Sequence, residues 1–187
     1  IHMNTKTLII FLICLGNIAI SFNVGAVAAA IPLISSDLQL ADIETAQLIS
    51  FYMLPYGIGA LLYAPLTRFI TYRLIMMAAM ALYAVFSLMT AVAVDLESML
   101  LAQIGAGIAA ACSTPLSLMI IGDLFDKDVR GRLVGIYFGT SFVASMVGMV
   151  CMGIFPWKLL FFVPCVIATL TTLLMGLCKI EVLDRVH

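Results

Sequence analysis

The chain has 187 residues, of which 64% are hydrophobic and 10% charged, and its formal net charge is −1 at pH 7. A soluble domain is typically about half apolar and a quarter charged, so this composition excludes an ordinary soluble globule, whose surface it could not cover. The near-neutral charge also indicates that nucleic acid is not a partner.

Six stretches without Asp, Glu, Lys or Arg divide the chain, and each is 20 to 30 residues long. About 20 helical residues cross a hydrocarbon core of about 30 Å, so every stretch is long enough to span a membrane. Lipid requires backbone groups to bond within their segment, and the stretches lack the alternating polarity of barrel strands. The charge-free stretches are 7–36, 45–67, 74–94, 98–122, 133–157 and 159–178.

The predicted fold class is therefore an all-α membrane protein, a bundle of six transmembrane helices forming a single domain over residues 4–187. We take Ile1-His2-Met3 as a vector-derived extension before a natural start at Met3 and exclude it from the fold. Pro32 should kink or end the first helix. The expected helices span about 7–34, 44–68, 73–94, 98–122, 130–155 and 157–179.

Polar residues inside these helices are few and uncharged. Two interpretations are open for them, a polar wall that contacts a substrate or hydrogen bonds between helices. Asn23 and Gln103 are the strongest candidates for substrate contact, because burying a large amide against lipid is costly. The candidate residues of a substrate cavity are Asn17, Ser21, Asn23, Tyr52, Tyr56, Gln103, Ser113, Thr114 and Ser117.

Glycines recur in the fourth and fifth expected helices. Small residues allow helix backbones to approach closely, which favours association where no hydrophobic effect operates between helices. Ordinary bundle packing and a sliding interface are both consistent with this pattern. The candidate helix-packing glycines are Gly105, Gly107, Gly131, Gly135, Gly139, Gly148 and Gly153.

Positive charge gathers on one side of the membrane. With six spans, eight of the nine Lys and Arg residues fall on the side that holds both termini, and only Lys158 falls on the other. The positive-inside rule then predicts cytoplasmic termini, in a multi-pass protein of the plasma or inner membrane. The eight are Lys6, Arg68, Arg73, Lys127, Arg130, Arg132, Lys179 and Arg185.

No metal, cofactor or enzyme activity is expected. The five cysteines all lie in the apolar stretches and form neither a CxxC pair nor a cluster with His. They are interpreted as small packing residues. The spans hold no catalytic acid or base, and the methionines around Met76 and Met80 are interpreted as packing or lipid-facing groups rather than a metal site.

Several short motifs occur in a characteristic order. Together they resemble the N-terminal six-helix half of a major facilitator superfamily transporter, over essentially the whole chain. That resemblance implies two inverted three-helix repeats, with the first and fourth helices facing a central cavity. The motifs are an ALPxI-type segment at Ala30–Ile34, a GxLxDRxGRR-type region in Tyr52–Arg73, an RxxQGxGAA-type stretch at Gln103–Ala111, the loop Asp123–Gly135, and Trp157-Lys158 with Phe161-Phe162.

The loop between the second and third helices departs from the family pattern. The family has an Asp there that helps to lock a cytoplasmic gate, whereas this chain has Thr67 or Arg68 at that position, depending on the alignment. Asp123 could supply an acid for Arg68 or Arg73 from the neighbouring loop. The residues expected at a cytoplasmic gate are Arg68, Arg73, Asp123, Arg130 and Arg132.

The resemblance implies membrane transport of a small molecule by alternating access. The spans hold no ionisable residue, so either the solute is neutral or apolar, or the coupling groups lie on a partner half. A single half lacks an opposing cavity wall, and we favour a half-transporter completed as a homodimer in the lipid bilayer. A fragment of a 12-helix transporter, or a non-transporting membrane protein with an assembly or structural role, is the alternative.

Overall fold

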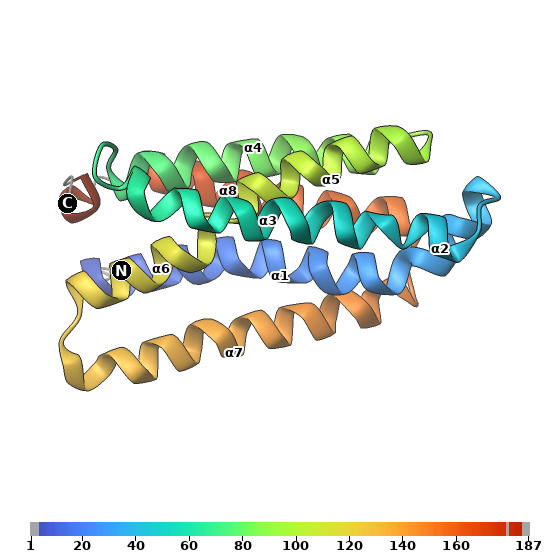
Figure 1. Ribbon diagram of the computed structural model, residues 1–187. Helices are drawn as coiled ribbons and strands as arrows, with labels where there is room; N and C mark the ends of the chain where they lie inside the picture. Colours follow the sequence, from blue (N-terminus) through green and yellow to red (C-terminus); the bar gives the residue numbers. More distant parts are fainter. Residues whose placement is uncertain (1–3, 179, 185–187) are drawn as a thin grey trace.

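The computed structural model describes residues 4–178 and 180–184, in which every regular element is helical. Six helical segments in these ranges are long and apolar enough to span a membrane, which confirms the predicted all-α membrane fold. Figure 1 shows them side by side along one axis, with both chain termini at one end of the bundle. Residues 1–3, which we expected to be a vector-derived extension, and Lys179 and Arg185 lie outside the described residues.

The helices match the expected spans to within a few residues at most boundaries. Two spans contain an interruption, so eight α-helices and one 3-10 helix are described. The elements are α1 Thr5–Leu38, α2 Asp42–Thr45, α3 Gln47–Leu66, α4 Tyr72–Val92, α5 Leu96–Ala110, α6 Ser113–Leu124, α7 Lys127–Met152, α8 Trp157–Leu177 and η1 Glu181–Asp184.

Proline has different effects in different helices. Helix α1 continues through Pro32 to Leu38, so the expectation that it could end near Pro32 is wrong. The span that contains Pro115 is instead interrupted at Ala111 and Cys112, between α5 and α6. Pro115 has no N–H to bond the carbonyl of Ala111 four residues earlier, which weakens the helix at that point.

The helices pack in a definite order around the bundle. Helix α1 packs against α7 and α8, α4 packs against α8 and α5, and α5 packs against α3. The series therefore runs α7, α1, α8, α4, α5, α3, and α3 and α7 are its two ends. These two spans are also little buried, with 17% of the residues of their most apolar window buried, against 61% in α1.

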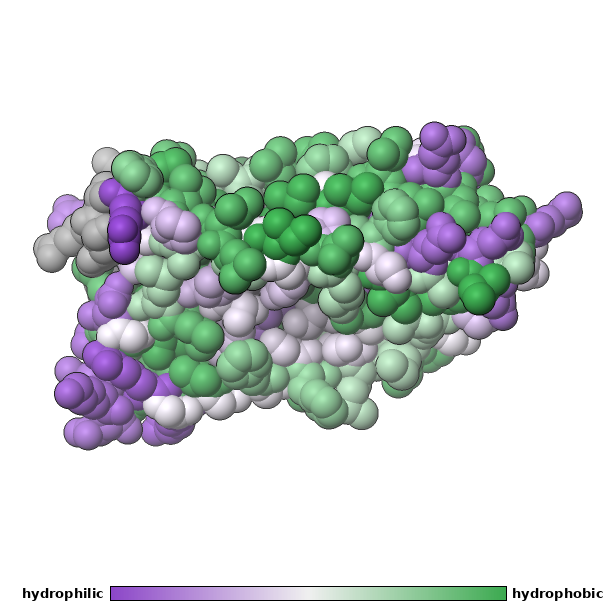
Figure 2. All heavy atoms as spheres, in the orientation of Figure 1, coloured by the Kyte–Doolittle hydropathy of each residue, from purple (hydrophilic) through white to green (hydrophobic). Residues whose placement is uncertain are grey.

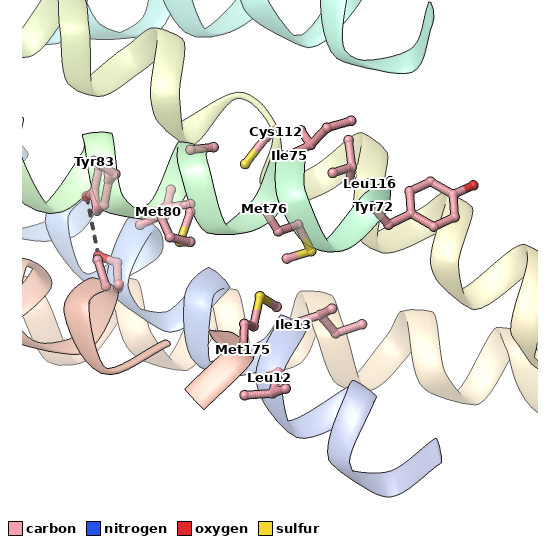
Figure 3. Packing of buried hydrophobic residues seen from close by; sticks show 14 of the residues in the cluster. Leu12, Ile13, Tyr72, Ile75, Met76, Met80, Tyr83, Cys112, Leu116 and Met175 are labelled. Carbon is pink, nitrogen blue, oxygen red and sulfur yellow. Dashed lines mark hydrogen bonds between the residues drawn. The ribbon is translucent and has the colours of Figure 1, made fainter. Parts of the chain in front are cut away.

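The interior is apolar and closely packed. In Figure 3, Met76 and Met80 of α4 lie beside Met175 of α8 and Leu12 of α1, and all four side chains are buried. Tyr83 hydroxyl donates to the carbonyl of Ala19, over 3.5 Å. These buried methionines fill space between helices, in agreement with the packing interpretation. Figure 2 shows an apolar flank between two hydrophilic ends, as expected for a membrane-spanning bundle.

The glycines fall into two groups. A Cβ on Gly148 of α7 would overlap the backbone carbonyl of Phe22 in α1, and one on Gly107 of α5 would overlap that of Tyr52 in α3. A Cβ on Gly105 would overlap the ring of Phe86. The remaining four do not contact another helix of the described chain in this way. Gly153 is near only the carbonyl of Val150 in its own helix, and Gly131, Gly135 and Gly139 have no such neighbour within 4 Å.

Candidate functional site

A groove of about 470 Å³ lies between the two ends of the helix series. Helices α1, α3, α6 and α7 all contribute side chains to it, and none of these side chains is charged. Figure 2 shows a paler, shaded strip in this part of the surface, between the positions of α3 and α7. The groove is lined by Asn17, Ile20, Ser21, Val24, Tyr52, Met53, Tyr56, Thr114, Phe138, Ser141, Phe142 and Ser145.

Five of the nine residues named from the sequence line this groove. Asn17 and Ser21 come from α1, Tyr52 and Tyr56 from α3, and Thr114 from the first turn of α6. The spacing of four residues in each of the first two pairs places both members on one helix face. On both α1 and α3, the polar residues that share a helix face therefore line the groove together.

Asn17 ties α1 to α7 beneath the groove. Its Nδ2 donates to the carbonyl of Tyr137 over 3.0 Å and also to Ser141 Oγ. Ser21 Oγ donates to Asn17 Oδ1 over 3.4 Å. Asn17 is buried, so its amide nitrogen serves helix packing, while Ser21 and Ser141 present hydroxyls at the groove.

A second set of hydroxyls lies where α6 begins. Tyr56 hydroxyl and Thr114 Oγ1 are hydrogen bonded at 3.0 Å, and Ser113 Oγ and Tyr137 hydroxyl at 2.9 Å. Ser113 and Ser117 are buried and do not line the groove. The interruption before α6 places Ser113 and Thr114 at the start of a helix, facing α3 and α7.

Aromatic rings form two walls of the groove. The rings of Tyr52 and Tyr56 on α3 stack with centroids 6.1 Å apart. Phe138 and Phe142, four residues apart on α7, line the other side and are 48% and 70% exposed. An apolar molecule with aromatic or ring character suits walls of this kind, and the hydroxyls between them offer hydrogen bonds.

Asn23 and Gln103 lie in a separate and smaller cavity of about 190 Å³. Asn23 is six residues beyond Asn17, so the two side chains point about 120° apart around the helix. Gln103 Nε2 donates to Thr90 Oγ1 over 3.2 Å. The two large amides that the sequence marked as the strongest candidates are thus beside the groove and outside it.

The residues expected at a gate lie at the end of the bundle that carries the termini. Arg73 donates to the carbonyls of Met175 and Gly176, each over 2.9 Å, and pairs with Asp184 at 3.0 Å. Asp123 accepts a hydrogen bond of 2.6 Å from Tyr72 hydroxyl. Of the two partners that the sequence left open for Asp123, Arg73 is therefore wrong, because its guanidinium instead binds free carbonyls at the C-terminus of α8 and pairs with Asp184.

The other three gate candidates have no ion pair within the described residues. Arg130 Nε donates to the carbonyl of Phe125 over 2.8 Å, and Arg68 and Arg132 are exposed. Across these described ranges, no group of three or more His, Cys, Asp or Glu residues is arranged to hold a metal ion. At the opposite end, Ser98 N–H and hydroxyl hold the pKa of the Asp95 carboxyl below its ordinary value.

Sequence reasoning missed Tyr137 and the α7 side of the groove. Tyr137 is buried, its carbonyl accepts a hydrogen bond from Asn17 of α1, and its hydroxyl is hydrogen bonded to Ser113 of α6. A tyrosine within an apolar stretch gives no distinct signal of this role. Ser141 and Ser145 are four residues apart on the same helix, and that spacing could have marked them as a polar face.

A family profile described as Major Facilitator Superfamily matches residues 13–183. A multidrug transporter of Candida glabrata is 25% identical over 148 residues, which are 79% of this chain and 26% of the relative. A probable L-galactonate transporter of Escherichia coli is 30% identical over 114 residues, which are 61% of this chain and 25% of the relative. The chain thus spans about a quarter of the length of these relatives.

Solved transporter structures share the fold. The crystal structure of a D-xylose–proton symporter superimposes with a TM-score of 0.79 at 14% identity, covering 94% of this chain and 49% of the symporter. A peptide transporter superimposes with a TM-score of 0.77 at 14% identity, covering 89% of this chain and 37% of that protein. The bundle is thus similar to about half of the symporter.

Proposed function

The chain belongs to the major facilitator superfamily, and from this premise we propose that it forms one half of a transporter that moves a small, uncharged solute by alternating access. The observation that carries the proposal is the uncharged groove between α1, α3, α6 and α7. Its amide, hydroxyl and aromatic side chains suit a ligand that is partly apolar and makes a few hydrogen bonds.

The open side of the groove supports the need for a second half. The groove is bordered by α3 and α7, two of the least buried spans. Hydroxyl groups exposed to hydrocarbon would lose their hydrogen bonds to water, at a cost of several kcal/mol each in the least favourable case. A second six-helix unit placed opposite would close the groove into a cavity between two walls.

We propose that a second copy of the chain supplies this unit. The faces of α3 and α7 next to the groove are apolar and uncharged, so two identical faces can meet without like-charge repulsion. Gly135 and Gly139 of α7 have no neighbour at the Cβ position, and Gly139 lines a shallow hollow beside Ile18 and Phe22 of α1. Small residues there would allow close approach of a helix from the second copy.

The neutral lining also supports an uncharged solute. A charged solute in a low-dielectric groove without an opposite charge would lose its hydration with little in return. A proton-coupled step in this family of mechanisms commonly uses a buried ionisable residue, and this groove has no carboxylate or imidazole among its lining residues. With two identical walls, the solute would move down its own gradient.

Cysteine accessibility tests the proposal without knowledge of the solute. In a variant with the five native cysteines replaced by alanine, Ser21→Cys would be exposed to a charged, membrane-impermeant thiol reagent in proteoliposomes. Alternating access predicts that the introduced thiol reacts when reagent is added to either side. The control Ser113→Cys, at a buried position bonded to Tyr137, should not react from either side. Reaction of the Ser21→Cys variant from one side only, or from neither, would contradict transport and favour a non-transporting membrane protein.

A further inference from the structure

A small cavity opens beside the groove. It has a volume of about 190 Å³ and shares three lining residues, Val24, Tyr52 and Met53, with the groove. Asn23 of α1 and Gln103 of α5 contribute the only amides to its lining within the described chain. Because the two hollows share these three residues, we treat the smaller one as a side chamber of the groove.

Hydrogen bonding fixes the orientation of the Gln103 amide. Thr90 Oγ1 donates to the carbonyl of Phe86 over 3.0 Å, so its hydrogen is already used and it accepts from Gln103 Nε2. This bond directs the amide nitrogen toward α4. The amide oxygen, Oε1, is consequently the end that remains for another donor.

The oxygen of Gln103 is a buried acceptor. The residue is 1% exposed, and Oε1 has no hydrogen-bond partner among the described residues. Asn23, also buried, lines the same chamber and carries both a donor and an acceptor. Buried polar groups are generally hydrogen bonded, so an acceptor of this kind favours a ligand that donates.

The rest of the side chamber limits the charge of that ligand. Its other walls are aliphatic, from residues such as Val27, Ile49 and Met53, except for Tyr52, whose hydroxyl is also buried without a hydrogen-bond partner among the described residues. None of its lining residues is charged. An ammonium or carboxylate group would be buried there without an opposite charge, which is strongly unfavourable. A hydroxyl or amide N–H meets the requirement for a donor and remains neutral.

We propose that the side chamber binds a hydroxyl or amide N–H group of an uncharged substrate, while the apolar body of the substrate lies in the groove. Gln103 Oε1 accepts the hydrogen bond, and Asn23 completes the polar side. The inference rests on the proposed function, because it assigns a substrate group to the same site. It identifies the substrate class as uncharged, largely apolar molecules with one hydrogen-bond donor.

Matched naphthalene probes test this assignment on the full chain in detergent. 2-Naphthylmethanol carries a hydroxyl donor, 2-methylnaphthalene has the same ring without it, and 2-naphthoate replaces it with a charge. Dissociation constants follow from the rise in unfolding temperature with probe concentration. We expect wild type to bind the alcohol at least tenfold more tightly than the methyl analogue, and the naphthoate more weakly than either.

Gln103→Leu removes the acceptor while keeping a side chain of similar size. We expect this variant to bind the alcohol and the methyl analogue within twofold of each other. Ser87→Ala is the control, since Ser87 is buried and does not line the side chamber. That variant should keep the preference of wild type for the alcohol.

The proposal is overturned if wild type binds the two neutral probes within twofold, or if the preference for the alcohol survives Gln103→Leu. If the methyl analogue binds as tightly as the alcohol, the side chamber does not bind the hydroxyl group, and binding of the ring in the groove stays supported. The thiol accessibility of the Ser21→Cys variant decides the proposed function separately, because it depends on no ligand.

Discussion

Asn17 illustrates what a single polar residue does inside this bundle. The sequence left two interpretations open, and the structure places its amide nitrogen on the Tyr137 carbonyl and on Ser141 of α7. It therefore joins two helices, while Ser21 and Ser141 carry hydroxyl groups to the groove surface. One residue thus contributes to helix packing and to the shape of the site.

Asn17→Leu should destabilise the bundle. The change keeps a side chain of similar volume but removes the donors that Tyr137 carbonyl and Ser141 use, so we expect the free energy of unfolding to fall by about 1–3 kcal/mol. Unfolding in mixed micelles, followed by circular dichroism, measures it. The control Thr169→Val changes an exposed residue whose hydroxyl donates to the Cys165 carbonyl of its own helix, and should alter stability by less than about 0.5 kcal/mol. Equal stability of Asn17→Leu and wild type would show that this amide does not join α1 to α7.

At the residue scale, periodicity predicted part of the site. The spacing of Asn17 and Ser21 placed both in the groove, and the same rule puts Asn23 about 120° around the helix from Asn17. Tyr137 was missed because an aromatic residue in an apolar run carries no polar pattern. The partner of Arg73 was missed because Asp184 is distant in sequence and the guanidinium is bound to carbonyls, which every residue has.

At the scale of the elements, glycine decides how closely two helices approach. Gly148 lets α7 lie directly against the backbone of Phe22 in α1, and Gly107 does the same between α5 and α3. The sequence pattern identified these positions together with Gly131, Gly135 and Gly139, which have no neighbour at the Cβ position. The spacing of the glycines shows which of them share a helix face. It does not show whether another helix lies against that face, because every face of these helices is apolar.

Gly148→Ala should separate α1 from α7. The added methyl overlaps the Phe22 carbonyl, so we expect a loss of about 1–3 kcal/mol or failure to fold. Gly122→Ala is the matched control, since a Cβ there meets no atom within 4 Å, and helix propensity predicts a gain of up to about 1 kcal/mol. The same unfolding assay measures both. A Gly148→Ala protein as stable as Gly122→Ala would contradict the close crossing of α1 and α7.

The prolines show that the local sequence does not determine where a helix is interrupted. Pro32 and Pro55 lie inside continuous helices, while the span of Pro115 is interrupted four residues before it. Each proline removes one backbone donor. Whether a helix continues past a proline depends on its packing against the surrounding helices. The local sequence contains no information about that packing.

At the scale of the whole molecule, the length of the charge-free stretches was sufficient to predict six spans. The arrangement of those spans was not predictable from composition, since in lipid an apolar residue is suited both to the interior and to the surface. Burial shows the difference, with α3 and α7 little buried and α1 and α5–α6 mostly buried. The two little-buried spans border the groove, which is the basis for a second half.

The central claim is that the groove is closed by a second copy of the chain, with α3 of one copy against α7 of the other. Leu61 is 77% exposed and lies in the last third of α3, and Gly135 lies in the first third of α7 and has a free Cβ position. The C-terminal end of α3 and the N-terminal end of α7 both lie at the end of the bundle that carries the termini (Figure 1). In cysteine-free protein, Leu61→Cys and Gly135→Cys would be placed on separate, differently tagged copies. Leu82→Cys, on the exposed face of α4 (52% exposed), replaces Leu61→Cys as the control.

Oxidative cross-linking in membranes measures directly whether α3 of one copy lies against α7 of the other. We predict a disulfide-linked dimer that carries both tags when Leu61→Cys is paired with Gly135→Cys, and none when Leu82→Cys is paired with it. Folded protein that gives no linked dimer with the first pair, or as much with the control pair, would contradict closure of the groove by a second copy.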